Sequence, residues 1–256
     1  MPEIILNEKE EEARERVCIA LDVPKVEDAL NLAGELSDFV NIFKVGKQLH
    51  TAAGNQGVNI FKEIYDRGGY AFGDLKFHDT PNTVYQAARA ITVPGVYLFN
   101  IHIAGGEEQC KKAVEGATER ANELGIDRPK VIGVTVLTSL DDKDLEAQKL
   151  GINYEDLVMK RTELAKEWGL DGVVCPANIA GQLENKFYDA LGSFIYVTPG
   201  IKWAGKAGTG QKQLYTPDLA VKDCSSSILV IGSAVTKADD RRGTAYDILQ
   251  AMAKEL

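Results

Sequence analysis

Cysteine is scarce in this chain of 256 residues: there are four, they lie far apart, and no two form a C-x-x-C pair. This spacing argues against a disulfide framework or a thiolate zinc site, and it favours a protein of a reducing compartment. Cys18 and Cys175 fall inside apolar runs. We therefore expect both to be small core residues.

Long apolar runs and net positive charge are absent too. No stretch approaches the length needed to span a bilayer, and the acidic start MPEIILNEKEEEARER lacks the apolar segment of a signal peptide. The net charge of −9 argues against non-specific binding to nucleic acid or acidic membranes. These features predict a soluble cytoplasmic protein. A phosphorylated small substrate is still compatible, because a few local lysines or arginines are enough to hold it.

Short β-branched runs alternate with helical patterns along the whole chain. The predicted strands are residues 17–23, 40–45, 70–76, 96–102, 130–136, 171–175, 193–198 and 228–232. Helical spacing is found at residues 26–36, 49–66, 83–91, 107–124, 154–168 and 244–256. This pattern predicts an α/β protein, a single-domain (β/α)8 TIM barrel over residues 1–256 with an N-terminal helical extension at 1–16. An open doubly wound sheet shows the same alternation.

Polar residues at the strand ends distinguish the two folds. The first four predicted strands end near Asp22, Lys44, Asp74 with Lys76, and His102, and Thr138 follows the fifth. In a closed barrel all carboxyl ends meet at one rim, where barrel enzymes carry their active sites. In an open sheet, residues from opposite edges lie too far apart to act together. We therefore predict the barrel.

The segment Asp74-Leu75-Lys76-Phe77-His78-Asp79 concentrates ionisable residues at this rim. Side chains at i and i+2 share one face of a strand, so Asp74 and Lys76 are expected to point into the barrel mouth while Leu75 packs outward. Lys44 would extend them into an alternating array that ends at Asp79. A salt-bridged surface strand is the alternative, but clusters of desolvated charges are more often functional than stabilising.

The residues after this segment predict the start of a helix. Pro81 suits a loop that leads into the first turn of a helix, and Asn82 is a candidate N-cap for a helix from Thr83.

Residues 74–84 read DLKFHDTPNTV, which resembles the signature of the orotidine 5′-monophosphate decarboxylase family. Further blocks similar to that family follow in its order: ALD at 20–22, FKVGK at 43–47, NIH at 100–102 with GG at 105–106, VTVLTS at 134–139, DGVVC at 171–175 and VTPGI at 197–201. The resemblance covers nearly the whole chain. It implies conversion of orotidine 5′-monophosphate to uridine 5′-monophosphate and CO₂ in de novo pyrimidine biosynthesis, with no cofactor and no metal.

The resemblance also implies roles for the charged residues. Lys76 would supply the proton that replaces the departing carboxylate at C6, and Asp74 would lie beside that carboxylate. Lys44 would hold the array and, with Asp22, reach the ribose hydroxyls. The family further implies a homodimer, in which Asp79 and Thr83 reach the partner's site. A fixed ammonium in a water-poor site suits this chemistry, because CO₂ loss leaves negative charge on carbon.

Other substrate contacts are implied at Thr80, Thr138, Pro199, Lys202, Gln211, Gly232 and Ser233. Thr138 would contact the pyrimidine edge, with a turn or helix-cap hydroxyl as the alternative reading. Residues 200–213 are rich in glycine and lysine and follow the seventh strand, where barrels commonly bind phosphate. The glycines suit a lid over the substrate, with a flexible surface loop as the alternative reading. Gln211 matches a family residue that bridges lid and ligand.

The chain departs from the family at the phosphate end. Ser233 and Lys202 stand where the family usually has arginine, and neither reproduces the planar, bidentate contact of arginine with phosphate. Lys202, Lys206 or Lys237 could supply the missing charge beside Ser233. The enzyme could instead be a weak decarboxylase, or its pocket could take another ligand. We favour the first interpretation because the catalytic array is intact.

Two rival functions stay open. One is a magnesium-dependent decarboxylase or aldolase of sugar phosphates from the same barrel group, which also uses D-x-K-x-x-D. The other is a non-catalytic nucleotide-binding barrel. His50, His78 and His102 do not have the spacing of a metal site, and we interpret His102 as a hydrogen-bonded structural residue.

Overall fold

Eight parallel strands form a closed barrel in the computed structural model, which describes residues 5–187, 194–203 and 215–223 together with 227–256. The strands are β1 (Val17–Ala20), β2 (Ile42–Gly46), β3 (Tyr70–Phe77), β4 (Val96–His102), β5 (Lys130–Val134), β6 (Gly172–Val174), β7 (Ile195–Ile201) and β8 (Ser227–Ile231). β1 pairs with both β2 and β8, which closes the ring. The predicted single-domain TIM barrel is confirmed.

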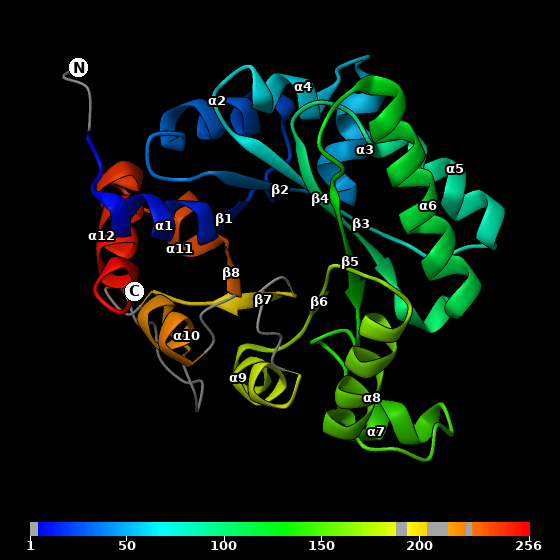
Figure 1. Cartoon of the computed structure of the whole chain (residues 1–256). Helices are drawn as coiled ribbons and strands as arrows, with labels where there is room; N and C mark the ends of the chain where they lie inside the picture. The colour runs from blue at the N-terminus through cyan, green and yellow to red at the C-terminus, as the bar shows by residue number, and fades with distance from the viewer. Residues whose placement is uncertain (1–4, 188–193, 204–214, 224–226) are drawn as a thin grey trace.

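Helices surround the barrel on the outside (Figure 1). They are α1 (Glu8–Arg16), α2 (Val26–Leu36), α3 (Lys47–Asn55), α4 (Ile60–Tyr65), α5 (Pro81–Ile91), α6 (Glu107–Leu124), α7 (Asp142–Ala147), α8 (Tyr154–Glu167), α9 (Ala177–Lys186), α10 (Pro217–Asp223), α11 (Ser233–Thr236) and α12 (Arg241–Ala253), with a 3₁₀ turn η1 (Ile103–Gly105). Within the described residues, none of these helices is both long enough and apolar enough to cross a membrane.

Two predictions about the helices are wrong. The single helix expected at 49–66 is two helices, α3 and α4, because the chain turns at Gly57, whose φ is +69°. The cap expected at Asn82 is instead Thr80, and α5 begins at Pro81. A proline fits the first helical position because its fixed φ is already helical and it has no N–H to leave unpaired.

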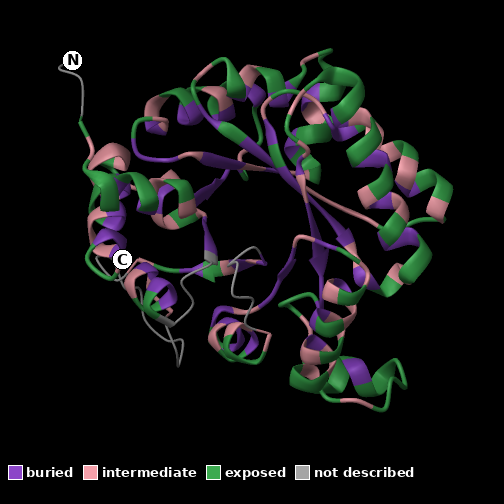
Figure 2. Ribbon diagram, viewed as in Figure 1, coloured by how far each residue is buried: buried purple, intermediate pink, exposed green. Residues whose placement is uncertain are grey.

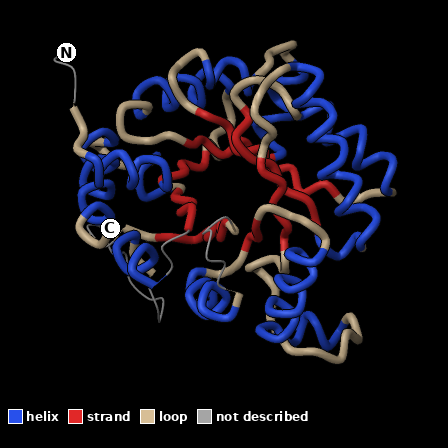
Figure 3. The backbone as a smooth tube through the Cα atoms, in the orientation of Figure 1, coloured by secondary structure: helices blue, strands red, loops and turns tan. Residues whose placement is uncertain are grey.

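The core has two layers, and strands are buried on both faces (Figure 2). One layer fills the barrel and consists of Cys18, Ala20, Ile42, Phe72, Leu98, Ile132, Val134, Val174, Val197, Ile228 and Val230. The other layer lies between the strands and the helices. Figure 3 shows these as an inner ring of strands and an outer ring of helices. Cys18 and Cys175 are both fully buried, as expected.

The inward-facing positions lead directly to the site. Successive inward residues on a strand are two apart, so Asp22 continues the row of Cys18 and Ala20. By the same rule Lys44 follows Ile42, Asp74 follows Phe72 and Asn100 follows Leu98. The apolar filling of the barrel therefore gives way to polar side chains at the carboxyl ends of β1 to β4.

Candidate active site

Four side chains of alternating charge, which we call the charge row, occupy the barrel mouth: Asp22, Lys44, Asp74 and Lys76. Lys44 Nζ lies 3.0 Å from Asp22 Oδ1 and 3.3 Å from Asp74 Oδ2, and Lys76 Nζ lies 2.5 Å from Asp74 Oδ1. The Lys44 and Asp74 side chains are only 12% and 13% exposed, whereas Asp22 is 64% exposed. The predicted proximity of Lys44, Asp74 and Lys76 is therefore present in the structure, and Asp22 joins them.

Both central members of this row are held in their charged forms. Burial by itself raises the pKa of the Asp74 carboxyl, but Lys44, Lys76 and Asn100 together outweigh it and leave that pKa below its usual value. Burial likewise lowers the pKa of Lys44, but Asp74 and Asp22 raise it above its usual value. A carboxylate and an ammonium thus face each other with little water around them, an arrangement typical of active sites.

A bulge in β3, rather than simple strand alternation, brings Lys76 to Asp74. Gly73 pairs with Phe99 and Phe77 pairs with Ile101, so four steps along β3 match two along β4. Lys76 has φ +50°, in the left-handed region that residues other than glycine seldom adopt. Leu75 packs against the core outside the barrel, as expected. Bulges of this kind often aim a side chain at an active site.

Asp79 lies outside the charge row within one chain. It is exposed, its carboxylate accepts a hydrogen bond from the Thr80 N–H at 2.6 Å, and it forms no ion pair among the described residues. Its own N–H donates to Gln109 Oε1 at 3.1 Å. The Thr80 and Thr83 hydroxyls are 2.9 Å apart at the exposed start of α5. These three residues therefore face solvent in the single chain.

A cavity of about 690 Å³ opens beside the row, on the side of β7 and β8. Six residues singled out from the sequence line it: Asp22, Lys44, Pro199, Lys202, Gly232 and Ser233. Lys237 lines it as well, and its ammonium forms no ion pair with any residue that the structure describes. Thr138 is exposed in the loop after β5 and is not among the lining residues. Gln211 and Lys206 lie outside the described residues.

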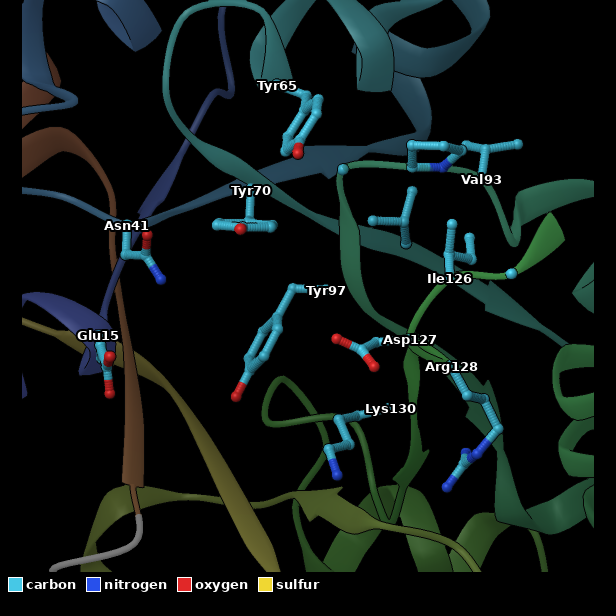
Figure 4. A pocket seen from close by; sticks show the side chains of 14 residues that line it. Glu15, Asn41, Tyr65, Tyr70, Val93, Tyr97, Ile126, Asp127, Arg128 and Lys130 are labelled. Atoms are coloured by element: carbon cyan, nitrogen blue, oxygen red, sulfur yellow. The ribbon is translucent and has the colours of Figure 1, made fainter. Parts of the chain in front are cut away.

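A larger cavity, of about 1050 Å³, lies at the opposite end of the barrel (Figure 4). Tyr65, Tyr70 and Tyr97 form a column there, with ring centroids 5.6 and 6.4 Å apart. Lys130 and Asp127 lie near the column at the amino end of β5. The charge row is at the carboxyl ends of the strands, which is where barrels place catalysis, so the smaller cavity is the candidate active site.

His102 has the features of a neutral structural residue. Its ring lies 5.3 Å from that of His78, and its pKa falls to about 4 because of burial, with His78 and the Lys76 ammonium adding to the effect. At neutral pH it therefore carries no charge. No group of three or more His, Cys, Asp or Glu residues that could hold a metal is found among the described residues.

Two buried polar residues near the site were not predicted to act there. Asn100 is 1% exposed and bonds to both Asp74 and the backbone of Lys76. Gln109 is fully buried and bridges Asp79 to the His102 carbonyl. Asn100 carried a signal, because it is a lone amide inside the apolar run VYLFNIH. Gln109 carried none, since glutamine is ordinary in an amphipathic helix.

The chain has a closed parallel barrel with paired lysines and aspartates at the carboxyl ends of its strands. These features place it in the class of TIM-barrel enzymes. The family model of the orotidine 5′-phosphate decarboxylase / HUMPS family matches residues 15–248, and the chain belongs to that family. The resemblance seen in the sequence is thereby confirmed.

Relatives that are named orotidine 5′-phosphate decarboxylase match most of the chain. The protein of Moorella thermoacetica is 42% identical, with 89% of this chain and 88% of that protein covered. The protein of Syntrophomonas wolfei is 40% identical, with coverages of 93% and 98%. Among solved structures, the orotidine 5′-phosphate decarboxylase of Lactobacillus acidophilus superposes with a TM-score of 0.78 at 29% identity, covering 93% of this chain and 99% of that one.

Proposed function

We propose that this chain decarboxylates orotidine 5′-monophosphate to uridine 5′-monophosphate in pyrimidine biosynthesis. Relatives of about 40% identity are named for that activity, and the match covers most of their length. The observation that supports it most directly is the desolvated row of charges, in which Lys76 Nζ lies 2.5 Å from Asp74 Oδ1 at the barrel mouth.

In this mechanism the bond between C6 and the carboxylate carbon breaks, CO₂ leaves, and the electron pair stays on C6. The Lys76 ammonium stabilises the developing charge and then transfers a proton to C6, forming the C–H bond. Solvent restores the proton on Lys76. A low local dielectric strengthens this stabilisation, and the Lys76 side chain is only 28% exposed.

The other members of the row orient the reactants. Asp74 lies where it would meet the substrate carboxylate, and its charge keeps the Lys76 ammonium in place. Lys44 bridges Asp74 and Asp22, and in the proposed complex Lys44 and Asp22 bind the ribose hydroxyls. Both line the cavity, which is consistent with contact to a ribose there.

The phosphate is proposed to bind at the far side of the same cavity. Lys237 and Lys202 supply positive charge, and Ser233 with Gly232 contributes a hydroxyl and backbone at the end of β8. Binding energy from such a remote group can be used to stabilise the transition state. Lys237 is the strongest candidate to replace the arginine that the family usually has at position 233.

We also propose that two chains assemble into a homodimer in the cytoplasm. Asp79, Thr80 and Thr83 are exposed at the carboxyl-end face, which leaves them accessible to a second chain. Asp79 and Thr83 would then complete the partner's site. Thr138 is proposed to contact the pyrimidine edge, and Gln211 to bridge the lid and the ligand.

The test is an ultraviolet assay for loss of orotidine 5′-monophosphate, run with and without EDTA. We expect equal turnover in both arms and a loss of about 10⁴-fold or more for Lys76→Ala, since both the proton donor and the charge stabilisation are removed. Lys62→Ala is the matched control, because Lys62 is an exposed lysine on α4 that pairs with Asp66. Near-normal turnover by Lys76→Ala would refute the assignment of the proton donor.

Two other outcomes would favour the rival functions. Activity that EDTA abolishes and magnesium restores, together with turnover of a sugar phosphate, would support the magnesium-dependent enzyme. Tight binding of a pyrimidine nucleotide without release of CO₂ would support a non-catalytic barrel.

A further inference from the structure

Asn100 uses both ends of its side-chain amide on the catalytic segment of β3. Its Nδ2 donates to Asp74 Oδ1 at 2.7 Å, and its Oδ1 accepts a hydrogen bond from the Lys76 N–H, also at 2.7 Å. The residue is 1% exposed and lies on the inward face of β4, two positions beyond Leu98. A buried amide must be paired to be tolerated, and here both of its partners belong to the charge row.

Asn100 also lies directly opposite the bulge of β3. It stands between Phe99 and Ile101, the two residues of β4 that pair with the ends of the bulged segment. Residues inside a bulge lose their regular ladder partners. The side-chain oxygen of Asn100 takes the N–H of Lys76 in place of a backbone carbonyl, and Lys76 is the residue with φ +50°. The amide thus stabilises a backbone conformation that lysine seldom adopts.

The same side chain fixes the target of the lysine. Asp74 Oδ1 accepts from Asn100 Nδ2 and lies 2.5 Å from Lys76 Nζ, so one oxygen is shared by the two donors. Asn100 therefore holds the backbone of Lys76 at one end and the carboxylate that orients its ammonium at the other.

We propose that Asn100 is a positioning residue for the proposed decarboxylation, setting the direction of the Lys76 ammonium by clamping the β3 bulge to Asp74. The inference rests on the proposed function, because turnover is its readout. It differs from a purely structural role, in which the buried amide would contribute to folding and leave the chemical step unchanged.

The first test is the steady-state kinetics of Asn100→Ala. We expect kcat to fall about 10²-fold with little change in KM, since an ammonium displaced by about 1 Å loses transition-state contact while substrate binding is retained. Thr162→Ala is the matched control. Thr162 is also fully buried and hydrogen-bonded, but it lies within α8 and donates to Val158.

The second test is the pH profile of kcat. Asp74 faces Lys44 from β2, Lys76 from its own strand and Asn100 from β4, with Asp22 and the buried Cys18 thiol on the side of β1. Asn100 is one of the groups that lower the pKa of Asp74, so removing it raises that pKa. The acid limb of the profile should therefore move to higher pH in Asn100→Ala and stay in place in Thr162→Ala.

Asn100→Asp gives an isosteric second variant. Its carboxylate can still accept the Lys76 N–H, but it places a second negative charge against Asp74 Oδ1. Two carboxylates in contact share a proton, so the acid limb should move further towards neutral pH than in Asn100→Ala.

Three results would overturn the inference: an acid limb at the wild-type position in both Asn100 variants, a fall in kcat no larger than that of Thr162→Ala, or a change confined to KM. Absence of turnover in the wild-type chain would instead refute the proposed function. The two failures are therefore distinguishable.

Discussion

Replacing Lys44 with methionine should destabilise the fold at neutral pH, mainly because the buried Asp74 carboxylate loses one of its two lysine partners. The Lys44 and Asp74 side chains are 12% and 13% exposed and their charges lie 3.3 Å apart. Removing one partner of a buried pair costs about 3–5 kcal/mol, because the remaining charge stays desolvated. Asp22 is 64% exposed, so its loss of a partner adds less than about 1 kcal/mol.

The expected loss is at the lower end of that range, about 3 kcal/mol, because Lys76 still neutralises Asp74. Urea titrations followed by far-ultraviolet circular dichroism, at one protein concentration, would measure it. Lys62→Met is the control. Lys62 is 64% exposed in its pair with Asp66, and its replacement should cost no more than about 0.5 kcal/mol.

The loss should also depend on pH. The Asp74 pKa is below its usual value, so its stabilising contribution is present above the unfolded-state pKa and disappears as pH falls through the folded-state pKa. The Lys44 pKa is above its usual value, so its contribution is present below the unfolded-state pKa and disappears at high pH. Without Lys44 the pKa of Asp74 rises. The difference between wild type and Lys44→Met should therefore shrink from pH 7 towards pH 4. An equal loss for both methionine variants, unchanged with pH, would refute this account.

Three further predictions concern other parts of the chain. Lys237→Ala should lower kcat/KM for the nucleotide but leave turnover of the dephosphorylated nucleoside unchanged; equal losses for both would exclude Lys237 as the phosphate ligand. Asp171→Ala should reduce the free energy of unfolding by about 3 kcal/mol, because both carboxylate oxygens of Asp171 bond to Arg128 at 2.7 Å. The pair lies at the end of the barrel remote from the charge row, so kcat should not change. A parallel fall in kcat would contradict this separation. Cys18 is fully buried and burial raises the pKa of its thiol, so peptide mapping should find it modified by a thiol reagent at pH 8 only after unfolding in urea.

The sequence predicted the barrel because short β-branched runs alternate with helical patterns and because polar residues follow the ends of these runs. The rule that inward positions repeat every two residues places Lys44 and Asp74 correctly at the mouth, since both continue rows of core residues. The break between α3 and α4 was not predicted because helical spacing continues through Gly57. The short helices α7, α9, α10 and α11 were not predicted for a different reason: each offers three turns of pattern or fewer.

The local geometry around Lys76 could not be read from the sequence. Alternation predicts that Asp74 and Lys76 share a face, but the structure joins them through a bulge with a left-handed lysine. Local preference disfavours that conformation, and a hydrogen bond from Lys76 N–H to Asn100, 24 residues away in the chain, stabilises it. Tertiary context of this kind leaves no periodic signal. The sequence contained a single indication of it, the amide of Asn100 in an otherwise apolar strand.

The two ends of the candidate site come from different parts of the barrel. Strands β1 to β4 supply the charge row and Asn100, whereas the ends of β7 and β8 supply Pro199 and Gly232, which are small and uncharged and border the open cavity. A change at the β8 end, such as serine at position 233, should therefore alter the proposed phosphate contact without disturbing the row.

This separation predicts that Asn100→Ala and Lys237→Ala act independently. The two residues share no partner among the described hydrogen bonds and ion pairs, since Asn100 bonds to Asp74 and Lys76 while Lys237 lines the cavity on the side of β8. Their effects on kcat/KM, expressed as activation free energies, should add within about 0.5 kcal/mol in the double variant. A coupling above about 1 kcal/mol would show that phosphate binding and the orientation of Lys76 are linked. The phosphate contact would then act by ordering the charge row, and the division of the site between the two parts of the barrel would be wrong.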